Sequence, residues 1–358
     1  MNVLFLNKHG GLGGGEIALM DHAFHLHRNG RNVKVLLRQP GALVDRLKTE
    51  GIDCRVGWAP RLGYRVQHMW WRSQLQKIVA KPSHDLIWVY TLDDLLLLGR
   101  QCVTGKVVCF RSQGEVYASL REDEANVKCL DVLMACHKVV CTTRYEYEYL
   151  LAKQLVHQER LSYIPIGVDC LRYGNLPTDT SSRPVIGMFG RLVPWKGHDV
   201  FLRALHAIRD FEWDAIIVGD ATYGRESDAA RLKNMAQEMA IDSRIRWVGF
   251  QSNVEDWFRQ CSIVVHCSRK EPFGMVIAEA MATGRCVVAS NVEGPREMIS
   301  PGDTGILCEP GDVSALAGEL RYLLQHSELR ESIGQKAAQV IRKRFDAGKS
   351  MVELASLS

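Results

Sequence analysis

The stretch Ile263-Val-Val-His-Cys-Ser-Arg-Lys-Glu271-Pro-Phe-Gly-Met-Val-Ile-Ala-Glu279 runs from an apolar strand through a turn into an apolar helix. Residues 263–265 are β-branched, which favours a buried strand, and residues 275–283 form an Ala/Met/Ile-rich run that a glycine closes. A strand that leads directly into a helix is half of a βαβ unit. This stretch therefore predicts an α/β fold.

Two carboxylates stand eight positions apart in this stretch. Glu279 lies inside the apolar helix, where an unpaired buried carboxylate is costly, so we expect a specific donor or ligand hydroxyls to hold it. Glu271 precedes the helix, close to free amides that suit an anion. These amides belong to Gly274, Met275 and Val276. Carboxylates accept from diols and amides donate to phosphates, which suggests a sugar nucleotide; for Glu279 the alternative is a satisfied buried salt bridge.

Strand-like segments alternate with helical or loop segments along the chain. The first series covers residues 3–7, 32–37, 53–56, 86–90, 107–110, 138–142 and 161–164, and the second covers residues 185–189, 215–218, 244–248, 263–265 and 286–289. This alternation predicts two doubly wound parallel sheets. Ligands bind beyond the carboxyl ends of the strands in such sheets, so we expect a ligand in a cleft between two domains.

The length of 358 residues also predicts two domains. Residues 175–184 are rich in turn formers and nearly free of large apolar side chains, which marks the boundary. We expect Rossmann-like domains at 1–170 and 185–340, joined by a linker at 171–184.

Composition describes an ordinary globular protein, with 46% hydrophobic and 24% charged residues. No apolar run is long enough to span a bilayer and the start has no basic leader, so we expect a cytoplasmic protein. The eleven cysteines include no Cys-x-x-Cys pair, and we expect reduced thiols rather than disulfides or a metal cluster.

Positive charge is concentrated at the front of the chain. Residues 1–81 contain thirteen Lys/Arg and five Asp/Glu, against a net charge of +4 for the whole chain. In residues 61–81 basic side chains alternate with Trp70 and Trp71, which suits peripheral contact with an anionic membrane. The alternative is a solvated helix whose tryptophans pack on their own domain. A nucleic-acid partner is not expected, because there is no recognition motif.

Two glycine-containing loops follow strands that open the two series. Lys8-His-Gly-Gly-Leu-Gly-Gly-Gly-Glu16 fits neither the dinucleotide fingerprint nor a P-loop. Val185-Ile-Gly-Met-Phe-Gly-Arg-Leu-Val-Pro-Trp-Lys-Gly-His198 brings Arg191 and Lys196 into one loop between a strand and a helix. Fixed cations in such a loop can stabilise charge on a leaving diphosphate.

The Glu-x7-Glu spacing, the Gly-Arg…Lys-Gly loop and the segments at 166–169, 218–220, 292–297 and 302–307 together resemble the retaining glycosyltransferases of family 4. That resemblance implies the GT-B fold, with an acceptor-binding first domain, a nucleotide-sugar-binding second domain and a C-terminal helix at 341–358 that packs back on the first. It implies that Arg191 and Lys196 hold the donor diphosphate, that Glu279 binds the ribose and that Glu271 binds the sugar hydroxyls.

In the first domain the resemblance rests on a Gly-Gly-x-Glu loop, matched by Gly13, Gly14 and Glu16, which in relatives lies against the donor phosphates and near the acceptor. Relatives commonly carry His after the strand that here is 107–110, whereas this chain has Gln113 as the best positional substitute. Three alternatives follow: the step needs no protein base, the residue specifies another donor, or activity is lost.

The resulting hypothesis is a retaining glycosyltransferase that needs no metal or cofactor and moves a sugar from a nucleoside diphosphate to a glycan or lipid-linked acceptor. Cell-surface polysaccharide or lipopolysaccharide assembly at the inner membrane face would suit the basic first domain. The alternatives are a nucleotide-sugar epimerase or hydrolase of the same fold, or a non-catalytic binding subunit. The base, the sugar and the acceptor are not specified by these motifs.

Overall fold

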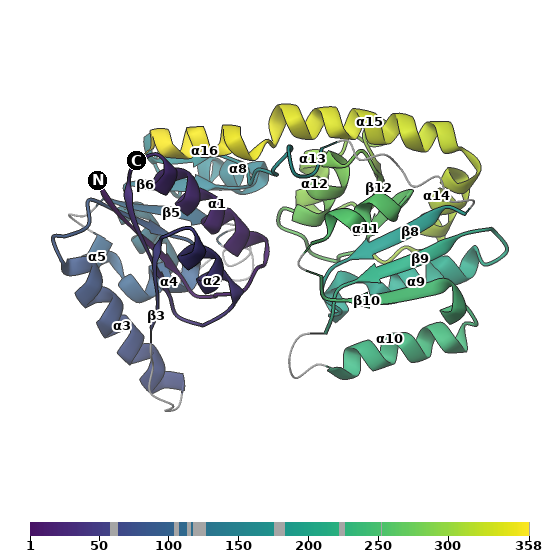
Figure 1. Ribbon diagram of the computed structural model, residues 1–358. Coiled ribbons are helices and arrows are strands. Elements are labelled where there is room, and N and C mark those ends of the chain that lie inside the picture. The colour runs from purple at the N-terminus through teal and green to yellow at the C-terminus, as the bar shows by residue number, and fades with distance from the viewer. Residues whose placement is uncertain are drawn as a thin grey trace. The chain divides into compact units, whose positions relative to one another are not determined.

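The computed structural model describes residues 1–57, 64–103, 107–112, 116, 127–174, 183–221, 226–251 and 253–357. The chain forms two compact units (Figure 1). The first comprises Met1–Gly167 and Ala347–Ser358, and the second comprises Val168–Asp346. The division falls before the expected linker because Tyr173 packs edge-on against Phe258 of the second unit, with ring centroids 6.3 Å apart.

The first unit is a seven-stranded parallel sheet in the order β3-β2-β1-β4-β5-β6-β7. Its strands are β1 (Asn2–Asn7), β2 (Asn32–Leu37), β3 (Asp53–Val56), β4 (Leu86–Val89), β5 (Val108–Ser112), β6 (Lys138–Cys141) and β7 (Leu161–Tyr163). Its helices are α1 (Gly14–Arg28), α2 (Ala42–Thr49), α3 (Tyr64–Ala80), α4 (Leu92–Leu98), α5 (Arg100–Val103), α7 (Val127–Ala135), α8 (Arg144–Ala152) and α16 (Ala347–Ser356).

The second unit is a six-stranded parallel sheet in the order β10-β9-β8-β11-β12-β13. Its strands are β8 (Val185–Phe189), β9 (Asp214–Val218), β10 (Ile245–Gly249), β11 (Ile263–His266), β12 (Cys286–Ser290) and β13 (Ile306–Cys308). Its α-helices are α9 (His198–Ala207), α10 (Glu226–Glu238), α11 (Glu255–Gln260), α12 (Met275–Ala282), α13 (Glu293–Met298), α14 (Val313–Gln325) and α15 (Ser327–Arg344). The predicted α/β fold class with two doubly wound sheets is confirmed; the short edge strand β13 was not anticipated.

Both sheets reverse their strand order at an equivalent place. In the first sheet β1 pairs with β2 on one side and with β4 on the other, and in the second β8 pairs with β9 and with β11. Helices that follow such strands leave a crevice at the carboxyl ends where the order reverses, and ligands bind there in open α/β sheets. We call these places the first and second switch points.

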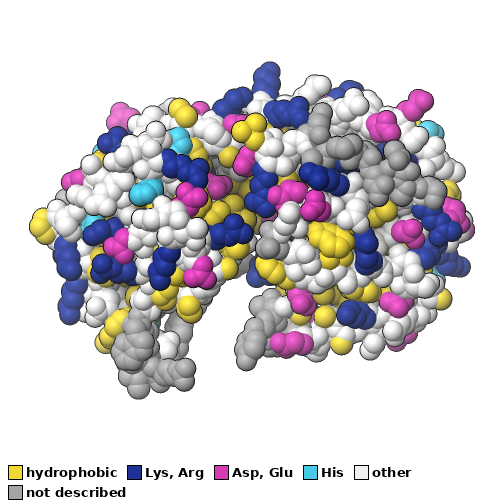
Figure 2. Space-filling model, in the orientation of Figure 1, with side chains coloured by type: hydrophobic (Ala, Val, Ile, Leu, Met, Phe, Trp, Pro, Cys, Tyr) yellow, Lys and Arg dark blue, Asp and Glu magenta, His cyan; other side chains and the backbone are white. Residues whose placement is uncertain are grey.

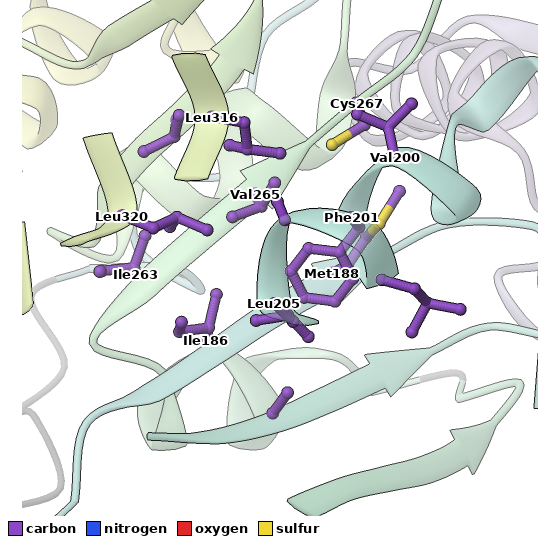
Figure 3. Packing of buried hydrophobic residues seen from close by; sticks show 14 of the residues in the cluster. Ile186, Met188, Val200, Phe201, Leu205, Ile263, Val265, Cys267, Leu316 and Leu320 are labelled. Atoms are coloured by element: carbon purple, nitrogen blue, oxygen red, sulfur yellow. The ribbon is translucent and has the colours of Figure 1, made fainter. Parts of the chain in front are cut away.

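A core of buried apolar side chains supports the second switch point. Figure 3 shows side chains of β8 and β11 meeting those of α9 and α14, among them Met188, Val265, Phe201 and Leu316. Because Phe201 and Val265 are fully buried, the loops that leave β8 and β11 start from rigid supports.

The C-terminal tail is divided between the units. α15 ends at Arg344, whereas the expected helix at 341–358 begins inside it, and α16 starts afresh at Ala347. The break coincides with Phe345, which is fully buried and packs against Phe273 with ring centroids 5.9 Å apart. Met351 and Leu354 of α16 then join the core of the first unit.

The basic segment at 61–81 lies partly outside the described residues, which resume at α3. Trp71 is buried in the core of the first unit together with Leu75 and Val79, and Trp70 packs against this core. The tryptophans therefore follow the packing alternative, and membrane contact through this segment stays a prediction. On the face in Figure 2, Lys/Arg side chains are interspersed with Asp/Glu. Among the described helices, none is long and apolar enough to cross a membrane.

Candidate functional site

The conformation of the loop after β8 requires a glycine at position 197. Gly197 has a φ of +76°, and a Cβ added there would lie 2.2 Å from the carbonyl oxygen of Cys267. This close approach brings the short 3₁₀ turn Pro194–Lys196 against the end of β11. Lys196 is thereby carried to the second switch point.

Lys196 meets Glu271 in a buried ion pair. The Lys196 Nζ and Glu271 Oε2 atoms are 2.6 Å apart, and the two side chains are 14% and 11% exposed. His266 Nε2 lies 3.0 Å from the same oxygen, and the Ser268 hydroxyl donates to it over 3.4 Å. No partner of Glu271 Oε1 occurs among the described side chains, so this second oxygen is available to a hydroxyl group.

The environment of Glu271 keeps it ionised. Burial alone would raise the pKa of its carboxyl group, but the hydrogen bond and charge of His266 and the charge of Lys196 outweigh burial and hold the pKa at about 2. A carboxylate that accepts two charge-assisted bonds is also held in one orientation.

His198 adds a buried imidazole beside this pair. It is only 2% exposed, and neither ring nitrogen has a hydrogen-bond partner among the described residues. Burial, followed by the charges of Lys196 and His266, lowers the pKa of His198 to about 3. The ring is therefore neutral at physiological pH, and it adds no charge next to Lys196.

The start of α12 lies directly beside Glu271. Gly274 caps this helix with a φ of +95° and without a side-chain hydrogen bond to the first-turn amides. A Cβ added at Gly274 would lie 3.3 Å from Glu271 Cγ. The amides of Met275 and Val276 are thus placed next to the ion pair, where partial positive charge collects at a helix N-terminus.

A second glycine supports the Glu271 turn from behind. Gly294 donates from its backbone N–H to the carbonyl oxygen of Glu271 over 3.0 Å, and a Cβ there would lie 2.3 Å from the carbonyl oxygen of Phe273. This contact explains why a glycine follows Glu293 at the start of α13: the turn must sit against bare backbone.

Glu279 lies within α12, where it is buried and has a hydrogen-bond partner of its own. It is 7% exposed and hydrogen-bonds to Tyr173, and the guanidinium of Arg172 also acts on it. Burial outweighs both and raises the pKa of Glu279 to about 7. Because Arg172 is itself paired with Glu255, its charge is shared between two carboxylates.

Arg191 approaches the same region through an aromatic ring. Its guanidinium carbon lies 5.8 Å from the centroid of Trp195, and Lys196 Nζ lies 4.5 Å from that centroid. Trp195 is 38% exposed, so one half-open indole holds both cations predicted to act together.

The other predicted residues belong to the first unit. Gly13 caps α1, Gly14 begins it and Glu16 lies in its first turn, where a Cβ added at Gly13 would lie 2.6 Å from Glu16 Oε2. The carboxylate of Glu16 therefore lies over the start of its own helix. Gln113 is outside the described residues.

Comparison with known proteins finds a family match within the second unit. Residues 178–340 match the family model described as glycosyl transferases group 1. Residues 178–340 are therefore similar to the glycosyl transferases of group 1. The matched residues include Lys196 and Glu271, together with Arg191 and Glu279.

Curated relatives share sequence with part of this chain. The lipopolysaccharide core biosynthesis mannosyltransferase LpcC of Rhizobium leguminosarum is 30% identical over 48% of this chain and 49% of its own. The D-inositol 3-phosphate glycosyltransferase of Corynebacterium glutamicum is 29% identical over 66% of this chain and 60% of its own. The chain thus spans about half the length of these curated relatives.

A solved structure covers nearly the whole chain. The crystal structure of HepE from Anabaena in complex with UDP-glucose has a TM-score of 0.83 and 25% identity, over 99% of this chain and 98% of that one. The GT-B fold expected from the motifs is confirmed by this likeness.

Several residues of the candidate site were not predicted from sequence. His266, Ser268 and His198 stand in the quoted stretches but were given no role there, and Tyr173 lies outside them. The available signal was position: His266 and Ser268 lie between an apolar strand and Glu271, where polar side chains follow the carboxyl end of the strand.

Proposed function

We propose that this chain is a retaining, metal-independent glycosyltransferase that transfers a sugar from a nucleoside-diphosphate sugar to a glycan or lipid-linked acceptor. One observation carries the proposal: at the second switch point Lys196 and the uncapped amides of α12 lie beside Glu271, whose Oε1 atom is open to a hydroxyl group. Cations and amides suit a diphosphate, and a carboxylate suits sugar hydroxyls.

The chemistry follows from charge. Negative charge grows on the diphosphate as the sugar leaves, and a fixed Lys196, with Arg191 on the same indole, stabilises it as a metal does in other enzymes. Glu271 holds the ammonium of Lys196 in place before the donor arrives and binds the sugar hydroxyls once it is there. Glu279 accepts from the ribose hydroxyls, which favours its ionised form.

For the acceptor we propose only a broad class of molecule. We propose a role in cell-surface polysaccharide or lipopolysaccharide assembly at the cytoplasmic membrane face, which the name of the Rhizobium relative supports. The Gly13-Gly14-x-Glu16 loop would lie near the donor phosphates and the acceptor. Gln113 would hydrogen-bond the donor sugar, with no protein base required.

The test is thermal stabilisation of the full chain by UDP- and GDP-sugars in the presence of EDTA. We expect at least one of them to raise the melting temperature, and Lys196→Met to abolish that rise. Arg203→Met is the matched control, because it removes a cation from the middle of α9 rather than from the loop before it.

Two outcomes would refute the proposal: stabilisation by none of these nucleotides, or full stabilisation retained in Lys196→Met. NMR of the product bond distinguishes retention from inversion at the anomeric carbon. Turnover of the donor without any acceptor would instead favour an epimerase or hydrolase.

A further inference from the structure

A short segment at the start of the second unit contacts Glu279. The segment runs from Val168 to Gly174, and it precedes residues 178–340, which match the family model. Tyr173 of this segment donates a hydrogen bond to Glu279 from its hydroxyl group. The Tyr173 and Glu279 residues are only 6% and 7% exposed, so the bond is shielded from water. A contact to this carboxylate therefore comes from outside the matched residues.

Backbone hydrogen bonds hold the segment in a fixed turn. The Asp169 side chain accepts from the backbone N–H of Leu171 over 3.0 Å and from that of Arg172 over 3.1 Å. The Asp169 carbonyl oxygen accepts from the backbone N–H of Tyr173 over 3.0 Å. An aspartate that bonds the backbone two residues on is typical of a tight turn. Because the turn is closed at both its ends, the Tyr173 side chain leaves it in one direction.

Aromatic packing holds the Tyr173 ring. Its centroid lies 6.3 Å from that of Phe258 in α11, with the two ring planes at 69°. Phe258 in turn stacks on Phe189 of β8, with centroids 4.1 Å apart. Since Phe258 is fully buried, this packing positions the Tyr173 ring without help from the hydroxyl group. Tyr173→Phe should therefore keep the ring in place and remove only the hydrogen bond.

The proton on Tyr173 makes its hydroxyl group a permanent donor. Burial, followed by the charge of Glu279, raises the pKa of Tyr173 well above its ordinary value. Glu279 experiences the opposite influence: burial raises its pKa to about 7, while the Tyr173 hydrogen bond and the charge of Arg172 lower it and the charge of Glu255 raises it. Tyr173 thus favours the ionised form of Glu279, since a hydrogen bond to a carboxylate stabilises its charge.

A carboxylate can serve Tyr173 and a ribose at the same time. Its two oxygens offer about four lone-pair sites, so one bond from Tyr173 leaves room for two neighbouring hydroxyl groups. We propose that Tyr173 is a positioning residue for the donor, whose hydroxyl group keeps the Glu279 carboxylate ionised and turned toward the ribose. The inference rests on the proposed function, which assigns Glu279 to the ribose hydroxyls.

The experiment is isothermal titration calorimetry of the full chain with UDP-glucose and GDP-mannose across neutral pH. Sugar nucleotides are used because the terminal phosphate of a free nucleoside diphosphate titrates near pH 6, at about the same pH as the effect sought. Wild-type affinity should fall as the pH drops below about 7, when Glu279 takes up a proton. Tyr173→Phe should move this fall by about one unit to higher pH, which lowers the affinity at about pH 6 roughly tenfold.

Tyr322→Phe is the matched control, because it removes the same hydroxyl group from α14, where Tyr322 is 49% exposed. This variant is expected to follow the wild-type pH profile. The 2′-deoxy counterparts of the two donors test the orientation of the carboxylate. The wild type should prefer the ribose form, and this preference should shrink in Tyr173→Phe.

The possible outcomes separate this inference from the proposed function. A wild-type pH profile in Tyr173→Phe, or a loss of affinity that is equal at every pH, would overturn the positioning role and leave the proposed function intact. An unchanged preference for the ribose form would overturn it as well. Binding of neither sugar nucleotide to the wild type would refute the proposed function and this inference together. Circular dichroism checks that both variants are folded.

Discussion

The two switch points of this molecule use the same pair of groups in different surroundings. At the first, Lys8 and Asp93 lie 2.5 Å apart with side chains 32% and 55% exposed. At the second, Lys196 and Glu271 lie 2.6 Å apart with side chains 14% and 11% exposed. In both, the lysine follows the first strand of its sheet and the carboxylate follows the strand next to it, β4 or β11.

Burial makes the difference between these pairs. An exposed ion pair contributes little to stability and exchanges its partners readily. A buried pair is costly to break, because either charge left alone would remain desolvated. His266 and Ser268 additionally bond Glu271, whereas Asp93 pairs with the partly exposed Lys8 and lies 3.8 Å from Arg38. The second pair suits a fixed site for charge that develops in a reaction, whereas the first is open to water.

The largest expected effect comes from removing the two lysines in turn. We expect Lys196→Met to lower kcat/KM for the donor by about 10² to 10³, the usual loss for one group that stabilises a developing charge. Lys8→Met should leave kcat/KM for the donor unchanged, because Lys8 belongs to the partly exposed pair of the first unit. Steady-state kinetics with both substrates varied would test this, and equal effects of both substitutions on the donor would remove the distinction between the two sites.

The buried pair should also dominate stability. The pKa of Glu271 is about 2 in the folded protein, against 4.5 without its environment. Its ionised form therefore contributes up to about 3 kcal/mol to the free energy of unfolding above pH 4.5. This contribution is lost as the pH falls through 2. Glu271→Gln should therefore lower the free energy of unfolding at pH 7 by that order and by less at pH 3. Urea titrations at both pH values measure it; a loss independent of pH would contradict the role given to ionisation.

Ionisation of Glu279 should lower the free energy of unfolding, whereas ionisation of Glu271 in the same unit raises it. Its pKa of about 7 exceeds the ordinary 4.5, so the stability due to its protonated form is complete below pH 4.5 and is lost as pH rises through 7. Glu279→Gln cannot ionise and should raise the free energy of unfolding at pH 8 by up to about 3 kcal/mol, with little change at pH 5. Donor affinity should fall in the same variant. A variant less stable than wild type at pH 8 would show that the Tyr173 bond outweighs burial.

Gly197, which follows Lys196, can be compared with Gly30, which lies between α1 and β2 of the first unit. Gly197 and Gly30 have φ values of +76° and +77°, but a Cβ at Gly30 would meet nothing within 4 Å. Gly30→Ala should cost about 1 kcal/mol from conformation alone, and Gly197→Ala about 2 kcal/mol more from its clash with Cys267. Thermal melts compare the two variants. Equal costs would mean that the loop after β8 can move away from β11 without loss.

The smallest effect is expected at the open pair. Asp93→Asn should change the free energy of unfolding by less than about 1 kcal/mol, as is usual for exposed ion pairs, and 0.5 M salt should remove most of the change by screening. The same urea titrations used for Glu271→Gln would show this. A cost as large as that of Glu271→Gln would mean that the first switch point is as rigid as the second.

The features predicted correctly from the sequence are those that short runs of residues specify. β-branched runs mark strands and apolar helices follow them, so the two sheets could be read from periodicity, as could the turn between β11 and α12. The loop with Arg191 and Lys196 was recognisable because glycines flank two cations between a strand and a helix. The edge strand β13 escaped this reading, since three residues carry too little pattern.

Contacts between distant segments could not be read in this way. The bond of His266 to Glu271, the neutral His198 and the hydrogen bond of Tyr173 to Glu279 depend on which loops meet after the sheet has formed. Tyr173 and Glu279 are far apart in sequence, and no local rule relates them. The pKa values of His198 and Glu279 follow from burial, which is a property of the packed unit and not of the chain.

The sequence by itself determined the order of strands and helices, the class of fold and the cations and carboxylates available to bind a ligand, because these depend on local pattern and residue type. The tertiary structure decided that Lys196 pairs with Glu271 in a buried site and that Lys8 pairs with Asp93 in an open one. The physical reason is that two like-charged lysines with similar neighbours in the chain acquire different roles only when the surrounding side chains exclude water from one pair and admit it to the other.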